Sequence, residues 1–167
     1  QRKGDPVMFS EDEFIKPKTT LEILAGLRPA FRKNGTVTAG NASGLNDGAA
    51  VVLVASDNGL KAHNLKPLSK IISSAVVGVE PRIMGIGPVS ATALALKRAG
   101  LTLKDMDVIE LNEAFAAQAL SCTRAWGIAD DDPRINPNGG AIALGHPLGM
   151  SGARLLQTAS LELQATG

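Results

Sequence analysis

Apolar positions along the chain gather in short continuous runs, which glycine, proline and polar clusters separate. Two of these runs, Gly48–Ala55 and Lys70–Val79, are rich in β-branched residues, the pattern of strands buried on both faces. A shorter run, Met106–Leu111, predicts a third strand. No run reaches the roughly 18 apolar residues that a membrane-spanning helix needs, so no membrane-spanning segment is predicted.

Helix signals alternate with these runs. Ser56 precedes one helical segment and Thr19 or Thr20 another, and both residue types are favoured N-caps. Gly87-Pro88 opens a helix with proline at its first position, and Gly100 closes it after two basic residues. The predicted helices are 20–27, 56–64, 87–99, 113–126 and 148–164, with a glycine-rich stretch at 135–144 before the last of them.

The order of the predicted elements indicates the fold class. Strands and helices alternate along most of the chain, which favours an α/β layered fold with helices packed against a mixed sheet. Residues 1–45 are rich in proline and glycine and are predicted to form mainly extended loop that packs on something larger. A domain boundary is predicted near Lys66-Pro67.

Composition narrows the possible functions. The chain has 167 residues, enough for one domain or one and a half, and 17 Lys and Arg against 16 Asp and Glu give a net charge of +1. The near-zero net charge gives no basic surface for nucleic acid, and aromatic residues, which could stack on bases, make up only 3%. Nucleic-acid binding is therefore not indicated. A single cysteine, Cys122, excludes an internal disulfide framework and a cysteine-rich zinc site, and its place in a predicted helix is typical of a small buried hydrophobe.

His146 is the first candidate for chemistry. It lies between Gly145 and Pro147, just before a predicted helix. Proline biases the preceding residue toward extended geometry, and nearby glycines let other groups approach the backbone. A histidine held in this way can transfer a proton or polarise a carbonyl near neutral pH. The alternative is a glycine-rich turn with an incidental histidine, and the lack of a second His or Cys nearby argues against a metal site.

Asn112 and the loop Gly35–Gly48 are two further candidates. Asn112 stands where a predicted strand meets a helix, the place where active groups of α/β folds collect. Its amide can hold a water or donate to an oxyanion, or it can be a helix N-cap, with Glu113 favouring the positive helix end. The loop offers small residues and hydroxyls to a polar ligand, or is an irregular connection rich in turn formers.

Other motifs favour no particular function. Gly85-Ile-Gly87 resembles the start of a dinucleotide-binding fingerprint, but the third glycine is missing and no strand runs into it. A nicotinamide-dependent oxidoreductase is therefore a distant alternative. His63 is predicted to be a surface residue near a helix end, and the sequence has no Gly-Lys-Ser/Thr phosphate-binding motif.

Three blocks taken together resemble the C-terminal part of the thiolase family, whose members make or cleave 3-oxoacyl-CoA. The blocks are Thr38–Gly48, Asn112–Ala116 and Asn138–Pro147, the last running on to Ser151–Arg154, and they stand in the family's order. Within the family, the sequence of these blocks is most similar to that of 3-oxoadipyl-CoA (beta-ketoadipyl-CoA) thiolases, and that of acetyl-CoA acetyltransferases is nearly as similar. The resemblance implies a thiolase-like αβαβα layering, here as a C-terminal portion with a mixed sheet covered by helices.

The resemblance also implies a role for each candidate residue. His146 matches the catalytic histidine that activates the nucleophilic cysteine and helps bind the thioester oxygen. Asn112 matches the asparagine that holds a water of this oxyanion site. The positions that match the lining of the channel for the pantetheine arm of CoA are Ser43, Ala39, Phe31, Ala114 and Phe115. Coenzyme A is then a substrate rather than a resident cofactor, no metal is implied, and the reaction is ping-pong through a cysteine acyl-enzyme.

The family's two catalytic cysteines have no match in this chain. The nucleophile belongs to the family's N-terminal half and the acid/base cysteine to a Cys-x-Gly-x-Gly segment beyond the histidine, and Cys122 matches neither. We therefore expect a fragment that is inactive alone and whose partner is the missing N-terminal half. Its expected parts are the tail of the loop domain at 1–45, the last strand and helix of the N-terminal domain at 46–66, and a C-terminal domain without its final strands at 67–167.

Two alternative functions stay open beside thiolase chemistry: a ketosynthase or sterol-carrier-like relative, and a non-catalytic acyl-CoA-binding module. The resemblance implies acyl-CoA and CoA as ligands, a homodimer or homotetramer for the intact protein, and no nucleic-acid or membrane partner. A cytoplasmic location of the bacterial type is expected. The chain begins at Gln1 rather than Met, and any targeting segment would lie upstream of it.

Overall fold

The computed structural model describes residues 4–167, and its regular elements are helices. The first half carries short ones: α1 (Leu21–Ala25), α2 (Asp57–Ala62) and the 3-10 turn η1 (Pro81–Ile86). The second half carries α3 (Gly87–Ala99), the 3-10 turn η2 (Leu103–Asp105), α4 (Ala116–Ala125), α5 (Ala141–Leu144) and α6 (Leu148–Thr166). None of the helices in residues 4–167 combines the length and the apolar character needed to cross a membrane.

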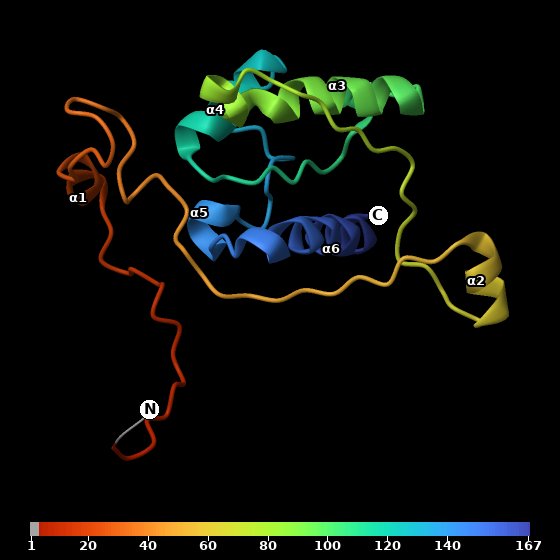
Figure 1. Ribbon diagram of the computed structural model, residues 1–167, viewed down its shortest axis with the longest axis horizontal. Coiled ribbons are helices and arrows are strands. Elements are labelled where there is room, and N and C mark those ends of the chain that lie inside the picture. The colour runs from red at the N-terminus through yellow and green to blue at the C-terminus, as the bar shows by residue number, and fades with distance from the viewer. Residues whose placement is uncertain (1–3) are drawn as a thin grey trace.

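The helices of the second half form two layers. Helices α3 and α4 lie along one side and α5 and α6 along the other, and the extended chain 106–115 runs between them (Figure 1). The buried apolar side chains come from all three parts: Leu111 from the central segment, Cys122 from α4 and Ala141 from α5. Helix α2 stands apart at the end of two extended segments (Figure 1). The two layers therefore hold the middle segment that carries Asn112.

Local capping signals fixed several helix ends as predicted. The side chains of Thr20 and Ser56 accept hydrogen bonds from the backbone amides three residues on, at the starts of α1 and α2. Helix α3 begins at Gly87-Pro88 and ends before Gly100, which takes the left-handed conformation with φ of 70°. These predictions are confirmed because a cap acts within one turn of chain and needs no distant partner.

The three predicted strands are extended, and within residues 4–167 none of them pairs along its length with another strand. Pairing is limited there to two isolated bridges, Ala42 with Phe115 (antiparallel) and Ile109 with Ile135 (parallel). Val51 in the run 48–55 is 90% exposed, and Val76 in the run 70–79 is 94% exposed. These runs are therefore not buried as their apolar sequence predicts. A strand is completed by a neighbouring strand that accepts and donates its backbone hydrogen bonds, and the described residues do not bring such neighbours to 48–55 or 70–79.

Two helix predictions in the second half were inaccurate. The helix predicted at 113–126 begins three residues later, at Ala116, because the residues before it bond to distant segments instead. The amide of Ala116 donates to the carbonyl of Asn41 at 2.9 Å, and the carbonyl of Ala114 accepts from the amide of Ser43 at 3.1 Å. The glycine-rich stretch also contains the one-turn helix α5, which the sequence analysis did not predict.

A buried ion pair joins the central segment to α6. The Arg154 guanidinium donates to a Glu110 carboxylate oxygen at 3.3 Å, and the two side chains are 16% and 4% exposed respectively. One further oxygen of Glu110 and one further nitrogen of Arg154 are buried without a partner in the described residues. Burial raises the pKa of the Glu110 carboxyl, and Arg154 opposes that rise.

Replacing Arg154 with alanine is expected to lower the free energy of unfolding by about 3 kcal/mol at neutral pH, since it leaves a buried carboxylate without its counter-charge. The pKa of Glu110 then rises further in the folded state. The loss is therefore largest at neutral pH and shrinks as the pH falls through that raised pKa, because the protonated form needs no counter-charge. Urea unfolding at neutral and acidic pH measures this.

The exposed pair Arg124–Asp130, with side chains 67% and 47% exposed, provides the matched control. Arg124→Ala is expected to leave stability almost unchanged, because exposed pairs are screened by solvent. Equal effects of the two substitutions, or an Arg154→Ala loss that does not depend on pH, would contradict the assignment of Glu110 as the charge that needs compensation.

Candidate active site

His146 lies in the three-residue loop between α5 and α6, and the backbone there is tightly enclosed. Its amide donates to the side-chain oxygen of Asn46 at 3.2 Å, across 100 residues of sequence. Gly145 is buried with φ of 98°, and a Cβ at this position would lie 2.6 Å from the same Asn46 oxygen. Only glycine satisfies both the left-handed backbone and the close approach. The histidine is therefore held at a fixed place.

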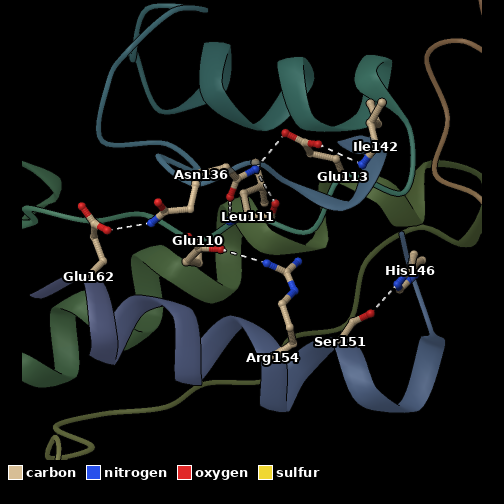
Figure 2. Close-up of polar contacts among 10 residues, drawn as sticks. Glu110, Leu111, Glu113, Asn136, Ile142, His146, Ser151, Arg154 and Glu162 are labelled. Carbon is tan, nitrogen blue, oxygen red and sulfur yellow. Dashed lines mark hydrogen bonds and ion pairs between the residues drawn. The ribbon is translucent and has the colours of Figure 1, made fainter. Parts of the chain in front are cut away.

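The imidazole ring is oriented by Ser151 on the first turns of α6 (Figure 2). Its Nδ1 lies 2.6 Å from the Ser151 hydroxyl, which is buried and lies within 3.3 Å of the carbonyl of Pro147. A hydroxyl has one proton, and if Ser151 donates it to Pro147 it accepts from the Nδ1–H of the ring. We assign the neutral ring this tautomer from the network. Nε2 is then the unprotonated nitrogen of the ring, and its lone pair is an acceptor.

The side chain of Asn112 meets the other side of the ring. Its Nδ2 lies 3.3 Å from His146 Nε2, across 34 residues of sequence. Asn112 precedes α4 by four residues and the N-cap of that helix is Phe115, so the helix-cap alternative left open by the sequence is excluded. The Asn112 Oδ1 atom is buried and has no partner among the described residues. An amide oxygen placed in this way can accept a hydrogen bond from a water or a ligand.

Asn136 is a site-supporting residue that the sequence analysis missed. It is buried, and its side chain accepts from the amide of Leu111 at 2.8 Å and donates to the Leu111 carbonyl at 2.9 Å. The amide side chain thus replaces a neighbouring strand for one residue of the central segment. Its backbone φ of 46° is a value that asparagine tolerates better than most residues. Asn136 lies in the stretch 135–144, which the sequence analysis described only as glycine-rich.

Four of the five predicted CoA-channel residues lie together. The Ser43 hydroxyl donates to the carbonyl of Ala114 at 3.2 Å, and the rings of Phe31 and Phe115 meet edge to face with centroids 5.9 Å apart. Ala39 lies in the exposed turn at 39–40, and no hydrogen bond within residues 4–167 ties it to this group. The segment 31–43 therefore docks on the chain that leads into α4, immediately after Asn112.

A cavity of about 390 Å³ opens directly beside the histidine loop. One wall is the segment 46–50 and the other is 147–150, with Pro147 and Met150 approaching Gly48. A Cβ at Gly48 would lie 2.6 Å from the Pro147 ring and 2.7 Å from the Met150 methyl. The glycine thus permits the close packing that forms the wall of the cavity next to His146.

Cys122 is a structural residue, as the sequence analysis predicted. It is fully buried in α4, and its Sγ donates to the carbonyl of Gly85 at 3.4 Å. Burial raises the pKa of the Cys122 thiol, which disfavours the reactive thiolate. The same contact places Gly85 in η1, where it packs on α4 rather than cradling a phosphate.

Because Cys122 is the only cysteine, its reactivity can be measured directly. We expect Ellman's reagent to label the native chain at least about 100-fold more slowly than the chain in urea, since labelling requires local or global opening. Cys122→Ser, which removes the labelling altogether, is the control for non-specific signal. Rapid labelling of a chain that circular dichroism shows to be folded would contradict the structural role.

The remaining features carry no site in the described residues. His63 is exposed and forms the C-cap of α2, as predicted. Within residues 4–167, no group of three or more His, Cys, Asp or Glu side chains is placed to hold a metal ion.

A histidine with an unprotonated Nε2 in contact with a side-chain amide is the arrangement of a candidate acyl-transfer site. Family models narrow the class. The model of the thiolase C-terminal domain matches residues 65–167, and that of the thiolase N-terminal domain matches residues 1–58. The chain belongs to the thiolase family.

Relatives and solved structures agree with this assignment. The chain is 62% identical over all 167 residues to a beta-ketoadipyl-CoA thiolase of Acinetobacter baylyi, and 60% identical over 162 residues to the 3-oxoadipyl-CoA/3-oxo-5,6-dehydrosuberyl-CoA thiolase of Escherichia coli. These matches cover 100% and 97% of the chain but 42% and 40% of the relatives. The chain therefore spans about two fifths of the length of these curated relatives.

The solved structures establish the fold class. The acetyl-CoA acetyltransferase of Bacillus anthracis superimposes with a TM-score of 0.86 at 46% identity, over 99% of this chain and 41% of that one. Human mitochondrial 3-ketoacyl-CoA thiolase in complex with CoA gives a TM-score of 0.80 at 49% identity, over 94% and 39%. The predicted thiolase resemblance and α/β fold class are confirmed.

Proposed function

We propose that this chain supplies the histidine and asparagine of a thiolase active site, which cleaves 3-oxoacyl-CoA by thiolysis or runs the reverse Claisen condensation. The contact between Asn112 and His146 Nε2 carries this proposal, since it joins two side chains 34 residues apart at 3.3 Å. A nucleophilic cysteine and an acid/base cysteine complete the site, both from segments other than those described here. By itself the chain is inactive.

The first step uses the unprotonated Nε2 of His146. Nε2 takes the proton of the nucleophilic thiol, and the thiolate attacks the 3-oxo carbon of the substrate. The C2–C3 bond then breaks, which leaves an acyl-enzyme and an acetyl-CoA enolate that is protonated by the acid/base cysteine. CoA thiol attacks the acyl-enzyme in the second half-reaction and releases the shortened acyl-CoA.

The same contacts support charge stabilisation in these steps. Once protonated, Nε2–H donates to the developing thioester oxyanion, while Nδ1–H keeps its acceptor in Ser151. The buried and unpartnered Asn112 Oδ1 is suited to hold a water that donates a second hydrogen bond to that oxygen. Because Ser151 accepts in both protonation states, the ring gains and loses a proton without turning.

CoA is proposed to enter over the segment 31–43. Ser43, Phe31, Ala114 and Phe115 would line the pantetheine channel, with Ala39 at its outer turn. The names of the bacterial relatives favour a 3-oxoadipyl-CoA-type substrate, with acetoacetyl-CoA as the alternative substrate. A cytoplasmic setting is proposed from the family resemblance. A homodimer or homotetramer is proposed for the assembled enzyme.

The test is a chimera in which this chain replaces the matching 167 residues of the Acinetobacter thiolase. At 62% identity we expect it to fold and to cleave 3-oxoadipyl-CoA in a CoA-dependent reaction, with mass spectrometry detecting an acylated cysteine outside the replaced segment. This chain alone, assayed in parallel, should show no cleavage.

The outcomes separate the alternatives. A folded chimera that condenses acyl groups but never performs thiolysis would favour the ketosynthase-like function. A chimera that binds CoA without any turnover would favour the acyl-CoA-binding module. Gel filtration and thermal melting against the parent thiolase show whether the chimera has folded. A folded and inactive chimera would overturn the proposal.

A further inference from the structure

The carboxylate of Glu113 bridges the two loops that carry Asn112 and His146. One oxygen accepts from the side-chain amide of Asn136 at 2.8 Å, and the other accepts from the backbone amide of Ile142 at 3.1 Å (Figure 2). Ile142 lies in α5, four residues before His146, and Glu113 directly follows Asn112. One side chain therefore braces the Asn112 segment against the start of the histidine loop.

The backbone around this carboxylate is shaped to admit it. Gly140 is buried at the N-cap of α5, and a Cβ built there would overlap the carboxyl group of Glu113. Asn136, the second donor to Glu113, is also bonded on both sides to Leu111, the residue before Asn112. The carboxylate is thus enclosed by the same segments whose spacing sets the contact between Asn112 and His146.

The alternative role for Glu113, as an acidic residue that favours the positive end of α4, does not agree with this arrangement. Helix α4 begins at Ala116, and no acidic residue lies in its first turn. The Glu113 carboxylate instead accepts from the first turn of α5 and from Asn136. The bonds of Glu113 join segments that are more than twenty residues apart in the sequence. Glu113 therefore acts on the position of these segments relative to each other.

We propose that Glu113 is a positioning residue that sets the separation of Asn112 and His146, and so the geometry of the oxyanion site. This inference rests on the proposed thiolase function. The group acts through its two acceptor oxygens as well as its shape. A carboxylate offers acceptors to both donors, whereas a glutamine of the same size must turn its NH₂ group toward either Asn136 or the Ile142 amide. One brace is then lost and two donors face each other.

The test compares Glu113→Gln with Glu162→Gln in the chimera. Glu162 makes the same type of bond, accepting from the side chain of Asn138 at 2.6 Å, but it joins α6 to an exposed turn rather than the two site loops. We expect Glu113→Gln to lower kcat about 10- to 100-fold with KM for CoA unchanged, the scale of loss for catalytic groups misplaced by up to 1 Å. Glu162→Gln should leave kcat within about twofold, as a control remote from the chemistry.

A double-mutant cycle separates positioning from general loss of structure. If Glu113 acts by placing Asn112 against His146, then Glu113→Gln should lower kcat far less in an Asn112→Ala background than in the wild-type background. If it serves only stability, the fold-change is the same in both backgrounds, and that result would overturn the inference.

Gly140→Ala, which displaces the carboxylate from the opposite side, should reproduce the Glu113→Gln loss of kcat. Normal kcat in a folded Gly140→Ala chimera would also contradict the inference. Should Asn112→Ala itself leave kcat unchanged, the proposed function fails instead, so the two failures are distinguishable.

Discussion

Replacing His146 with alanine is expected to lower kcat of the chimera about 10³- to 10⁴-fold, with little change in thermal stability. The substitution removes the ring nitrogen that lies 3.3 Å from Asn112 Nδ2, which is the proposed base for the thiol proton. A general base contributes about 10²- to 10⁴-fold, and the same nitrogen is also proposed to bind the oxyanion. Steady-state thiolysis with 3-oxoadipyl-CoA measures the loss.

The chain provides a matched control in its only other histidine. His63 is exposed at the end of α2, and His63→Ala should retain full activity. Acyl-enzyme formation, followed by mass spectrometry after rapid quenching, should be slowed in His146→Ala and normal in His63→Ala. Unchanged turnover in a folded His146→Ala chimera would remove the basis of the proposed mechanism.

Replacing Asn112 with alanine is expected to lower kcat about 10²- to 10³-fold, the loss of about 2.7–4 kcal/mol typical of one oxyanion donor. The side chain makes no contact that holds a helix end, so its loss should alter transition-state stabilisation more than folding. KM for CoA should change little, because the segment 31–43 contacts Ala114 and Phe115 rather than Asn112. Stopped-flow measurement of each half-reaction locates the affected step.

Two further variants sharpen the test of Asn112. Asn112→Asp keeps an acceptor oxygen but replaces the donor nitrogen, and its carboxylate would oppose a developing oxyanion, so its kcat should be as low as that of Asn112→Ala. Asn138→Ala, at an exposed asparagine bonded to Glu162, is the control and should be fully active. An Asn112→Ala chimera with normal kcat would show that the contact with His146 has no catalytic role.

The two substitutions are not expected to add. Asn112 and His146 are in contact and are proposed to bind the same oxygen. Removing one residue is therefore expected to reduce the contribution of the other to kcat. The double variant should therefore be little slower than His146→Ala alone. Full additivity of the two effects would indicate independent roles in different steps.

Much of the site was visible in the sequence because its signals are local. His146 stood out through the glycines and proline around it, and those glycines are needed where Gly145 approaches Asn46. The ends of α1, α2 and α3 followed from Thr20, Ser56 and Gly100, each acting on its own turn. The family resemblance added roles for Asn112 and Ser43 that local physics left undecided.

Other parts of the site depended on residues that sequence cannot bring together. In the sequence, Ser151 is only one residue of the block Ser151–Arg154. The structure places its hydroxyl 2.6 Å from Nδ1 of His146. Glu113 had a plausible local role at a helix end, which the contacts to Asn136 and Ile142 replaced. The predicted strands are extended, but within residues 4–167 pairing is limited to isolated bridges, because the apolar pattern indicates a preference for burial and not which segment provides it.

The sequence by itself determined the thiolase membership, the α/β class, most helix ends and the identity of the histidine and asparagine candidates. Only the tertiary structure decided that Asn112 faces the ring rather than caps α4, that Ser151 orients the ring, and that Glu113 braces the two loops. The physical reason is range. Caps and turns are fixed by atoms within one turn of chain, whereas a hydrogen bond between side chains 34 residues apart depends on the path of everything between them.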